Sequence, residues 1–372
     1  MSRGPSGPEE RAWEVVRRAF DERAVAPRRS RRWLVAAAVA SAAVVVAAVL
    51  SPPGRAVFHR VREAVGVEHA DVALFSLPAP GRLLVVSENG GGVWLVQDNG
   101  FKRKLGTYTD AEWSPHGLYV VATRPNELVT LDPENGERWT LARRGASQPR
   151  WEGTMTDTRI AYLTPGAVRV VAGDGTGDRL LARAARVPPA WSPGRLHTLA
   201  YLTPGKTIVL QQVDTGRVLW RRAPGNAPRS LAWSSDGTML AAAAPRRVVV
   251  LSGTGAVARV VSTLSGTITG AAFEPGTHRL ALTIRRASGS EIKVVDVDHP
   301  GAARLLFAGP GTFRDIVWSP NGRWLLVDWP TANQWVFLHG ARVHAVANIR
   351  EEFHRRDDVV PSLRVAGRWC CR

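Results

Sequence analysis

Apolar and polar positions alternate in short stretches over most of the chain, from about residue 72 to residue 350. The apolar stretches are rich in Val, Leu, Ile and aromatic residues, and Gly, Pro, Asn or Asp separates them. Alternation with a period of two is typical of β-strands, and the separating residues are typical of turns. The pattern predicts an all-β domain without long helices.

The strand-turn pattern repeats about every forty residues. Clear copies read AEWSPHGLYVVA, LAWSSDGTMLAAA and IVWSPNGRWLLVDW. In each copy a strand ends in an aromatic residue, a turn containing Pro or Gly follows, and a second apolar strand begins. Seven copies, two of them degenerate, are marked by their aromatic residues Phe75, Trp113, Trp151, Trp191, Trp233, Phe273 and Trp318. This period is typical of a four-stranded propeller blade, so we expect a β-propeller of about seven blades over residues 72–354.

The aromatic residue in every copy has two interpretations. Packing between neighbouring blades is favoured, because each large ring buries much area and stands just before a turn in all seven units. A cage that stacks sugars or cations is the alternative.

Trp-Ser-Pro-x-Gly followed by an apolar strand resembles the WSPDG-type blades of TolB-like propellers, distant relatives of WD-repeat propellers. The resemblance covers about 280 residues. The Asp of that motif is kept as Asp236 but replaced by His116 and Asn321, and Phe273-Glu274-Pro275 stands for Trp-Ser-Pro in unit six. The Gly-His…Trp-Asp signature of WD repeats is absent. The resemblance implies a propeller and leaves its ligand open.

The tail, residues 355–372, contains a further strand pattern, LRVAGRW. A ring of blades must join its first and last units, since open edges invite aggregation. We therefore expect residues 363–369 to pair within or beside the first blade as a closing strand.

An uncharged run, WLVAAAVASAAVVVAAVL, occupies residues 33–50. As a helix it would extend about 27 Å, close to the ~30 Å hydrocarbon core of a bilayer. Basic residues are more numerous in residues 1–32 than in the stalk, residues 51–71, so the positive-inside rule places the N-terminus in the cytoplasm and the propeller outside. We expect an uncleaved membrane anchor; a buried core helix, and a twin-arginine export signal at Arg31-Arg32, are the alternatives.

The leader, residues 1–32, contains an amphipathic pattern over residues 9–25. Trp13, Val16 and Phe20 share one face of the predicted helix. This face suits a cytoplasmic protein partner, and the surrounding arginines suit anionic headgroups equally well.

The chain of 372 residues carries a formal charge of +17, with 49 basic residues of which only four are lysines. The leader contributes +4, residues 51–70 contribute +1 and residues 350–372 contribute +2, which leaves +10 on the repeats. The arginine bias is typical of a GC-rich genome, and with the propeller outside the cell no nucleic-acid partner is expected. A positive propeller there would attract anionic wall polymers or lipid headgroups.

Catalytic, cofactor and metal-binding motifs are not found in the sequence, and no catalytic residue, cofactor or metal is predicted. The segment GDGTGD, residues 173–178, is interpreted as a hairpin turn. Histidines are scattered. The acids at blade turns could line one rim of the ring: Asp132, Asp214, Asp236, Asp296 and Asp298.

Cys370 and Cys371 are the only cysteines and are adjacent. A vicinal disulfide, a bond to another chain and a soft-metal site are all open, beside a plain role in capping the closing strand.

These patterns together predict a membrane-anchored, extracytoplasmic propeller that acts as a non-enzymatic binding or scaffold module. A hydrolase or lyase with its site in the central channel is the alternative, and it would require titratable groups converging at the channel mouth.

Overall fold

The computed structural model of the chain describes residues 76–371, except residues 89–90, 263–264, 300 and 354–361. The leader with Trp13, Val16 and Phe20, the apolar run, the stalk and Phe75 all lie outside the described residues. Within the described residues, no helix is both long enough and apolar enough to cross a membrane.

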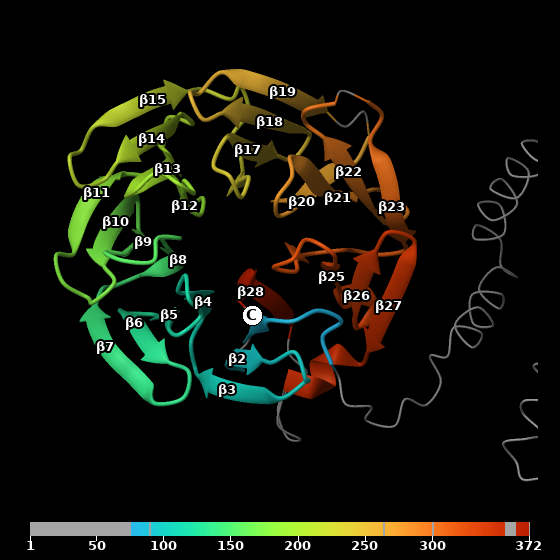
Figure 1. Cartoon of the computed structure of the whole chain (residues 1–372), viewed down its shortest axis with the longest axis horizontal. Helices are drawn as coiled ribbons and strands as arrows, with labels where there is room; N and C mark the ends of the chain where they lie inside the picture. Colours follow the sequence, from blue (N-terminus) through green and yellow to red (C-terminus); the bar gives the residue numbers. More distant parts are fainter. Residues whose placement is uncertain (1–75, 89–90, 263–264, 300, 354–361, 372) are drawn as a thin grey trace, which may run out of the picture. The chain divides into compact units, whose positions relative to one another are not determined.

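Seven four-stranded antiparallel sheets are arranged radially around a central channel (Figure 1). The described part of the chain is therefore a seven-bladed β-propeller, as the repeat period predicts. Blades are numbered here along the chain, and their strands are given from the channel outward.

Blade 1 comprises β28 (Leu363–Cys370), β1 (Arg82–Ser87), β2 (Gly92–Val96) and β3 (Lys102–Gly106). Blade 2 comprises β4 (Asp110–Trp113), β5 (Val120–Arg124), β6 (Glu127–Asp132) and β7 (Gly136–Ala142). Blade 3 comprises β8 (Ser147–Trp151), β9 (Arg159–Thr164), β10 (Ala167–Ala172) and β11 (Arg179–Arg183). Blade 4 comprises β12 (Ala190–Trp191), β13 (Thr198–Leu202), β14 (Ile208–Gln212) and β15 (Val218–Arg222).

Blade 5 comprises β16 (Ser230–Trp233), β17 (Met239–Ala244), β18 (Arg247–Ser252) and β19 (Val257–Ser262). Blade 6 comprises β20 (Thr267–Phe273), β21 (Arg279–Arg285), β22 (Ser290–Asp296) and β23 (Arg304–Gly309). Blade 7 comprises β24 (Ile316–Trp318), β25 (Leu325–Trp329), β26 (Gln334–His339) and β27 (Arg342–Ala347). Two short 3-10 helices, η1 (Pro330–Ala332) and η2 (Ile349–Phe353), flank β26 and β27.

The second and third strands of each blade are buried on both faces. In β17 and β18, for example, the run of Ala and Val side chains is almost wholly inaccessible to solvent. The outer strands β7, β19 and β27 are largely exposed, because no further strand covers them. Each sheet therefore packs both faces against neighbouring blades, and the hydrophobic cores lie between blades.

The ring closes through its C-terminal strand. β28 pairs antiparallel with β1, with Val365 opposite Val85 and Leu363 opposite Ser87, and becomes the innermost strand of blade 1 (Figure 1). The closing strand expected at residues 363–369 is thus confirmed. Trp369 packs in the core between blades 7 and 1, where its ring centroid lies 5.9 Å from that of Phe337.

Candidate functional site

Three of the motif tryptophans join the innermost strands of neighbouring blades. The indole N–H of Trp191 donates a hydrogen bond to the carbonyl of Arg150, in the preceding blade, at 2.8 Å. Trp233 and Trp318 make the equivalent bond at 3.2 Å, each to the residue that precedes the motif aromatic of the blade before. Those two rings are half-buried, whereas the buried rings are Trp113, Trp151, Trp191 and Phe273.

Blade 1 takes its motif aromatic from the other end of the chain. Because β28 is its innermost strand, Trp369 holds the place that Trp113 holds in blade 2. Cys370 and Cys371 then occupy the places of Ser and Pro in the Trp-Ser-Pro turns.

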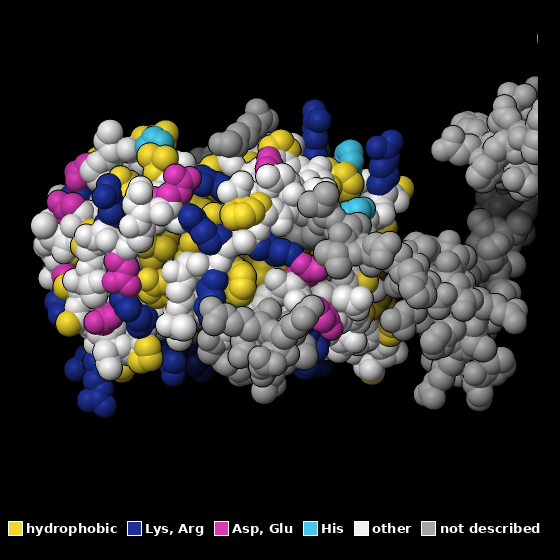
Figure 2. Space-filling model, turned by 90° about the horizontal axis from the view of Figure 1, so that it is seen from below, with side chains coloured by type: hydrophobic (Ala, Val, Ile, Leu, Met, Phe, Trp, Pro, Cys, Tyr) yellow, Lys and Arg dark blue, Asp and Glu magenta, His cyan; other side chains and the backbone are white. Residues whose placement is uncertain are grey.

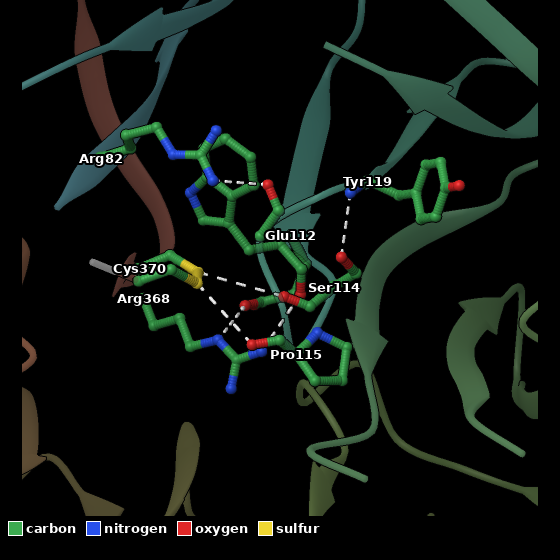
Figure 3. Close-up of a disulfide and its surroundings, with 10 residues drawn as sticks. Arg82, Glu112, Ser114, Pro115, Tyr119, Arg368 and Cys370 are labelled. Atoms are coloured by element: carbon green, nitrogen blue, oxygen red, sulfur yellow. Dashed lines mark hydrogen bonds and ion pairs between the residues drawn. A yellow bond between two sulfur atoms is a disulfide. The ribbon is translucent and has the colours of Figure 1, made fainter. Parts of the chain in front are cut away.

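The two cysteines form a disulfide between neighbouring residues. Figure 3 shows this pair against the turn that follows β4. Cys370 Sγ lies 4.0 Å from the carbonyl oxygen of Ser114, and Cys371 Sγ lies 3.7 Å from that of Pro115. The disulfide therefore packs where the last residues of the closing strand meet blade 2.

A cavity of about 1040 Å³ occupies the central channel. One part of its wall is charged, with Glu112 on β4, Arg150 on β8 and Arg368 on β28. Each of these residues directly precedes the motif aromatic of its strand. The residues at the same position in blades 5 to 7 are Ala232, Ala272 and Val317.

Glu112 lies between two arginines. Its carboxylate oxygens are 3.9 Å from Arg150 Nη1 and 3.8 Å from Arg368 Nε. Burial raises the pKa of Glu112, while the two guanidinium groups act in the opposite direction. Gly367 lets β28 approach this carboxylate: its φ is 63°, and a Cβ there would lie 2.5 Å from Glu112 Oε2.

A second set of acids holds β28 from both sides. Arg364 Nη2 donates to Asp110 Oδ1 of blade 2 at 2.8 Å, and the Val365 N–H donates to Asp315 Oδ2 beside blade 7 at 3.0 Å. Burial raises the pKa of Asp315 to about 6. Burial, and then the nearby Asp315 carboxylate, raises the pKa of Asp328 to about 8.

His197 lies at the turn between β12 and β13 and is buried. Its backbone N–H donates to Glu152 Oε1 at 2.5 Å, Nδ1 faces the Asp214 carboxylate, and Nε2 lies 2.6 Å from the carbonyl oxygen of Asp157. Both ring nitrogens therefore lie against oxygen atoms, and these contacts fix the ring within the turn.

The turns after the innermost strands lie together at one end of the channel, which we call the motif-turn face. On blades 2, 3 and 4 these turns expose Leu118, Met155 and Leu196, with 60%, 62% and 57% of each residue accessible. Leu118 and Met155 line one pocket, and Met155 and Leu196 line the channel cavity. Each of the three side chains borders one or both of these hollows, and we call the set the apolar rim.

Blades 5 and 6 carry charged groups at this face instead. His278 lies between Asp236 and Asp298, with ring nitrogens 2.9 Å and 2.8 Å from their carboxylate oxygens. Burial lowers the pKa of His278, but the hydrogen bonds with Asp298 and Asp236 outweigh it, so the pKa is raised.

The other turn acids do not gather into one site. Asp132 and Asp296 accept hydrogen bonds within their own turns, while Asp214 faces His197. The segment 173–178 is the hairpin turn between β10 and β11, and the carboxylate of Asp178 pairs with Arg143 and Arg169. In the described part of the chain, no three His, Cys, Asp or Glu side chains are placed to hold a metal ion.

Sequence reasoning missed the charged channel wall. A local feature of the sequence could have revealed this wall. The residue before each motif aromatic faces the channel, and it is charged only in blades 1, 2 and 3. Glu112 and Arg150 could have been found in this way, whereas Arg368 required knowing that β28 belongs to the first blade.

Comparison with known proteins identifies the fold alone. No protein-family model and no curated protein matches the sequence. Among solved structures, the chain is similar to Kuenenia stuttgartiensis hydrazine synthase (12% identity, 73% of this chain and 80% of that chain, TM-score 0.52). It is also similar to the β-propeller domain of Cps50 (Swd1) from Myceliophteria thermophila (14% identity, 64% and 85%, TM-score 0.51).

A chain of the mitotic checkpoint complex is similar as well, at 14% identity over 73% of this chain and 94% of that chain, with a TM-score of 0.55. These neighbours place the chain among propellers with WD40-like relatives. They include an enzyme and a chain of a protein complex, so the fold by itself does not select a function.

Proposed function

We propose that the propeller is a non-enzymatic binding module that engages a protein partner at its motif-turn face, through the apolar rim. The observation that carries this proposal is the exposure of Leu118, Met155 and Leu196 at equivalent turns of three consecutive blades. Single exposed apolar side chains are common, but adjacent ones bordering a cavity are typical of interaction sites.

The charge distribution of the channel wall and of the outer side of the ring supports a protein partner over a small charged ligand. The channel cavity is lined by three acids and three arginines, so its wall is close to neutral: Glu112, Glu152 and Asp315, and Arg150, Arg364 and Arg368. Figure 2 shows Lys and Arg side chains spread among Asp and Glu over the visible side of the molecule, without one basic patch. The occurrence of a similar propeller in the mitotic checkpoint complex is consistent with a role in protein assembly.

Crosslinking at the rim tests this function. A photoreactive residue at Leu196, in the full-length protein in its native cells, is expected to give a discrete adduct with a partner. The control position is Leu305 on β23, which is 53% exposed but lies on an outer strand. Met155→Glu should remove the Leu196 adduct, because a charge at the centre of the rim would be desolvated on binding. Equal adducts at the two positions, or an adduct that survives Met155→Glu, would contradict the proposal.

We also propose that residues 33–50 anchor the protein in the membrane, with the leader in the cytoplasm and a TolB-like propeller outside. The uncharged run and the basic leader support this topology. The net charge of +10 on the repeats would favour partners that carry or accompany anionic wall polymers, and Trp13, Val16 and Phe20 would face a cytoplasmic partner.

The topology is tested by adding protease to intact cells that express the protein with a tag at each end. Only the C-terminal tag should be digested, and the full-length protein should stay in the membrane fraction. Protection of the C-terminal tag with loss of the N-terminal tag would invert the topology and bring nucleic acid back as a partner.

An enzyme active in the channel is the second candidate, and Asp315 favours it. This acid lines the channel cavity, and its pKa of about 6 lies near the working range of a general acid or base. Asp315→Asn would abolish such an activity but leave the Leu196 adduct unchanged.

A further inference from the structure

A pocket of about 410 Å³ opens beside the apolar rim, between blades 2 and 3. Leu118 and Met155 stand at its border, and three aromatic side chains line it: Tyr119, Trp139 and Trp151. Both indole N–H groups are already used, since Trp139 donates to the carbonyl of Gly173 at 3.1 Å and Trp151 to Thr158 Oγ1 at 3.0 Å. The aromatic walls are therefore fixed by the protein, and most of the lining is apolar.

One buried polar group in this pocket is left without a partner. Thr130 lies on β6 and is 2% exposed, and its Oγ1 has no hydrogen-bond partner among the described residues. Leu128, two residues earlier on the same strand, belongs to the core between blades 2 and 3. Because side chains alternate along a strand, Thr130 faces blade 3 as well, at a position where an aliphatic residue would complete the core.

An unsatisfied buried hydroxyl is costly, and buried polar groups in proteins nearly always have partners. Thr130 lines the pocket although its Oγ1 is itself inaccessible to solvent, so a hydrogen bond with a bound group requires this side chain to turn about χ1 toward the pocket. The flat walls favour an aromatic group, since aromatic rings pack favourably on one another when stacked or edge-on.

We propose that this pocket receives a tyrosine side chain of the partner protein, with the ring between the aromatic walls and the phenol hydroxyl bonded to Thr130 Oγ1. The inference rests on the proposed function and names the anchor of that interaction. Residues beside this tyrosine would then lie along Leu118, Met155 and Leu196. Arg138 and Asp174, which also line the pocket, provide opposite charges for polar groups of the same segment.

The pocket is expected to distinguish tyrosine from phenylalanine. A phenylalanine ring would fill the same space but leave Thr130 Oγ1 buried and unpartnered, so its binding should be about three- to tenfold weaker. An aliphatic side chain would in addition lose the aromatic contacts.

The probes are N-acetyl-tyrosinamide and N-acetyl-phenylalaninamide, titrated into the full-length protein and followed by ligand-observed NMR. The wild-type protein should bind the tyrosine probe about three- to tenfold more tightly than the phenylalanine probe. Thr130→Val keeps the shape of the side chain but removes the hydroxyl, and it should bring the two affinities together. Thr283→Val is the matched control, because Thr283 is also buried with an unpartnered Oγ1 but lies on β21, away from this pocket.

Equal binding of the two probes by the wild-type protein would overturn the proposal, as would a preference that survives Thr130→Val or is lost in Thr283→Val. The absence of binding by either probe would overturn it too. The wild-type comparison needs no variant, so it remains decisive even where Thr130→Val does not fold. If the probe titration fails while the Leu196 adduct is still formed, the tyrosine anchor is disproved but the apolar rim remains the binding site. The two results are independent because Leu196 does not line this pocket.

Discussion

Removal of residues 362–372 is expected to abolish the cooperative thermal unfolding of the propeller. The truncation deletes β28, which supplies five wholly or nearly buried side chains: Leu363, Val365, Ala366, Trp369 and Cys370. Truncation of a single buried Trp to Ala costs about 3–5 kcal/mol, and the net stability of a domain is typically about 5–15 kcal/mol. Loss of the whole strand also leaves the pairing edge of β1 open. The free energy lost with β28 therefore exceeds the net stability of the domain.

The measurement is thermal unfolding followed by circular dichroism. Removal of Arg372 alone is the control and should leave the melting temperature unchanged, because β28 ends at Cys370. A synthetic peptide of residues 362–371 added to the truncated protein should restore a cooperative transition. An unaltered melting curve for the truncation would show that the ring does not depend on its closing strand.

The free energy of unfolding is expected to fall as the pH rises from about 4.5 to 8.5. The pKa of Asp315 is about 6 and that of Asp328 about 8 in the folded protein, both raised from 3.8 chiefly by burial. At pH values between 3.8 and these raised pKa values, the folded state binds more protons than the unfolded state. Raising the pH in this range therefore favours unfolding. The expected loss is on the order of 1–4 kcal/mol.

His278 contributes in the same direction. Its pKa in the folded protein is raised above 6.5, so the stability it adds is fully present below pH 6.5 and is lost as the pH rises through the folded value. Asp236 acts oppositely but at lower pH: although burial acts to raise its pKa, hydrogen bonds from Ser234, Thr238 and His278 outweigh it and hold the pKa below 3.8. Its contribution is lost only below about pH 4, outside the chosen window.

Urea unfolding at pH 4.5, 6.5 and 8.5 measures this dependence. Asp328→Asn should remove the larger part of the slope, because the amide keeps the shape of the side chain but does not titrate. His278→Gln should remove a smaller part. If the variant Asp328→Asn retains the full wild-type slope, the buried acid pair beside β28 is not the titrating group.

The repeat period and the closing strand were open to prediction because they are properties of the chain itself. A strand that ends in Trp113, a Pro-Gly turn and a following apolar strand are local features, and their recurrence every forty residues is visible without any contact information. The tail could be recognised as a strand by the same alternation. Its partner followed from a physical requirement, since a ring has to cover its first and last edges.

The functional surfaces depended on the ring geometry. Glu112, Arg150 and Arg368 come together only because ring closure brings residue 368 beside residue 112. His197 looked like an isolated turn residue, whereas its partner Glu152 comes from the preceding blade. The apolar rim was missed for a similar reason: Leu118, Met155 and Leu196 are unremarkable turn residues until equivalent turns are placed side by side.

The sequence by itself therefore determined the class of fold, an approximate number of blades and a candidate closing strand, because these follow from short-range alternation and a regular period. Only the tertiary structure decided which charges face the channel, which apolar side chains share a face, and that Thr130 lies unpartnered in an aromatic pocket. Those properties arise from contacts between residues far apart in the chain, and a repeat pattern carries no information about such contacts.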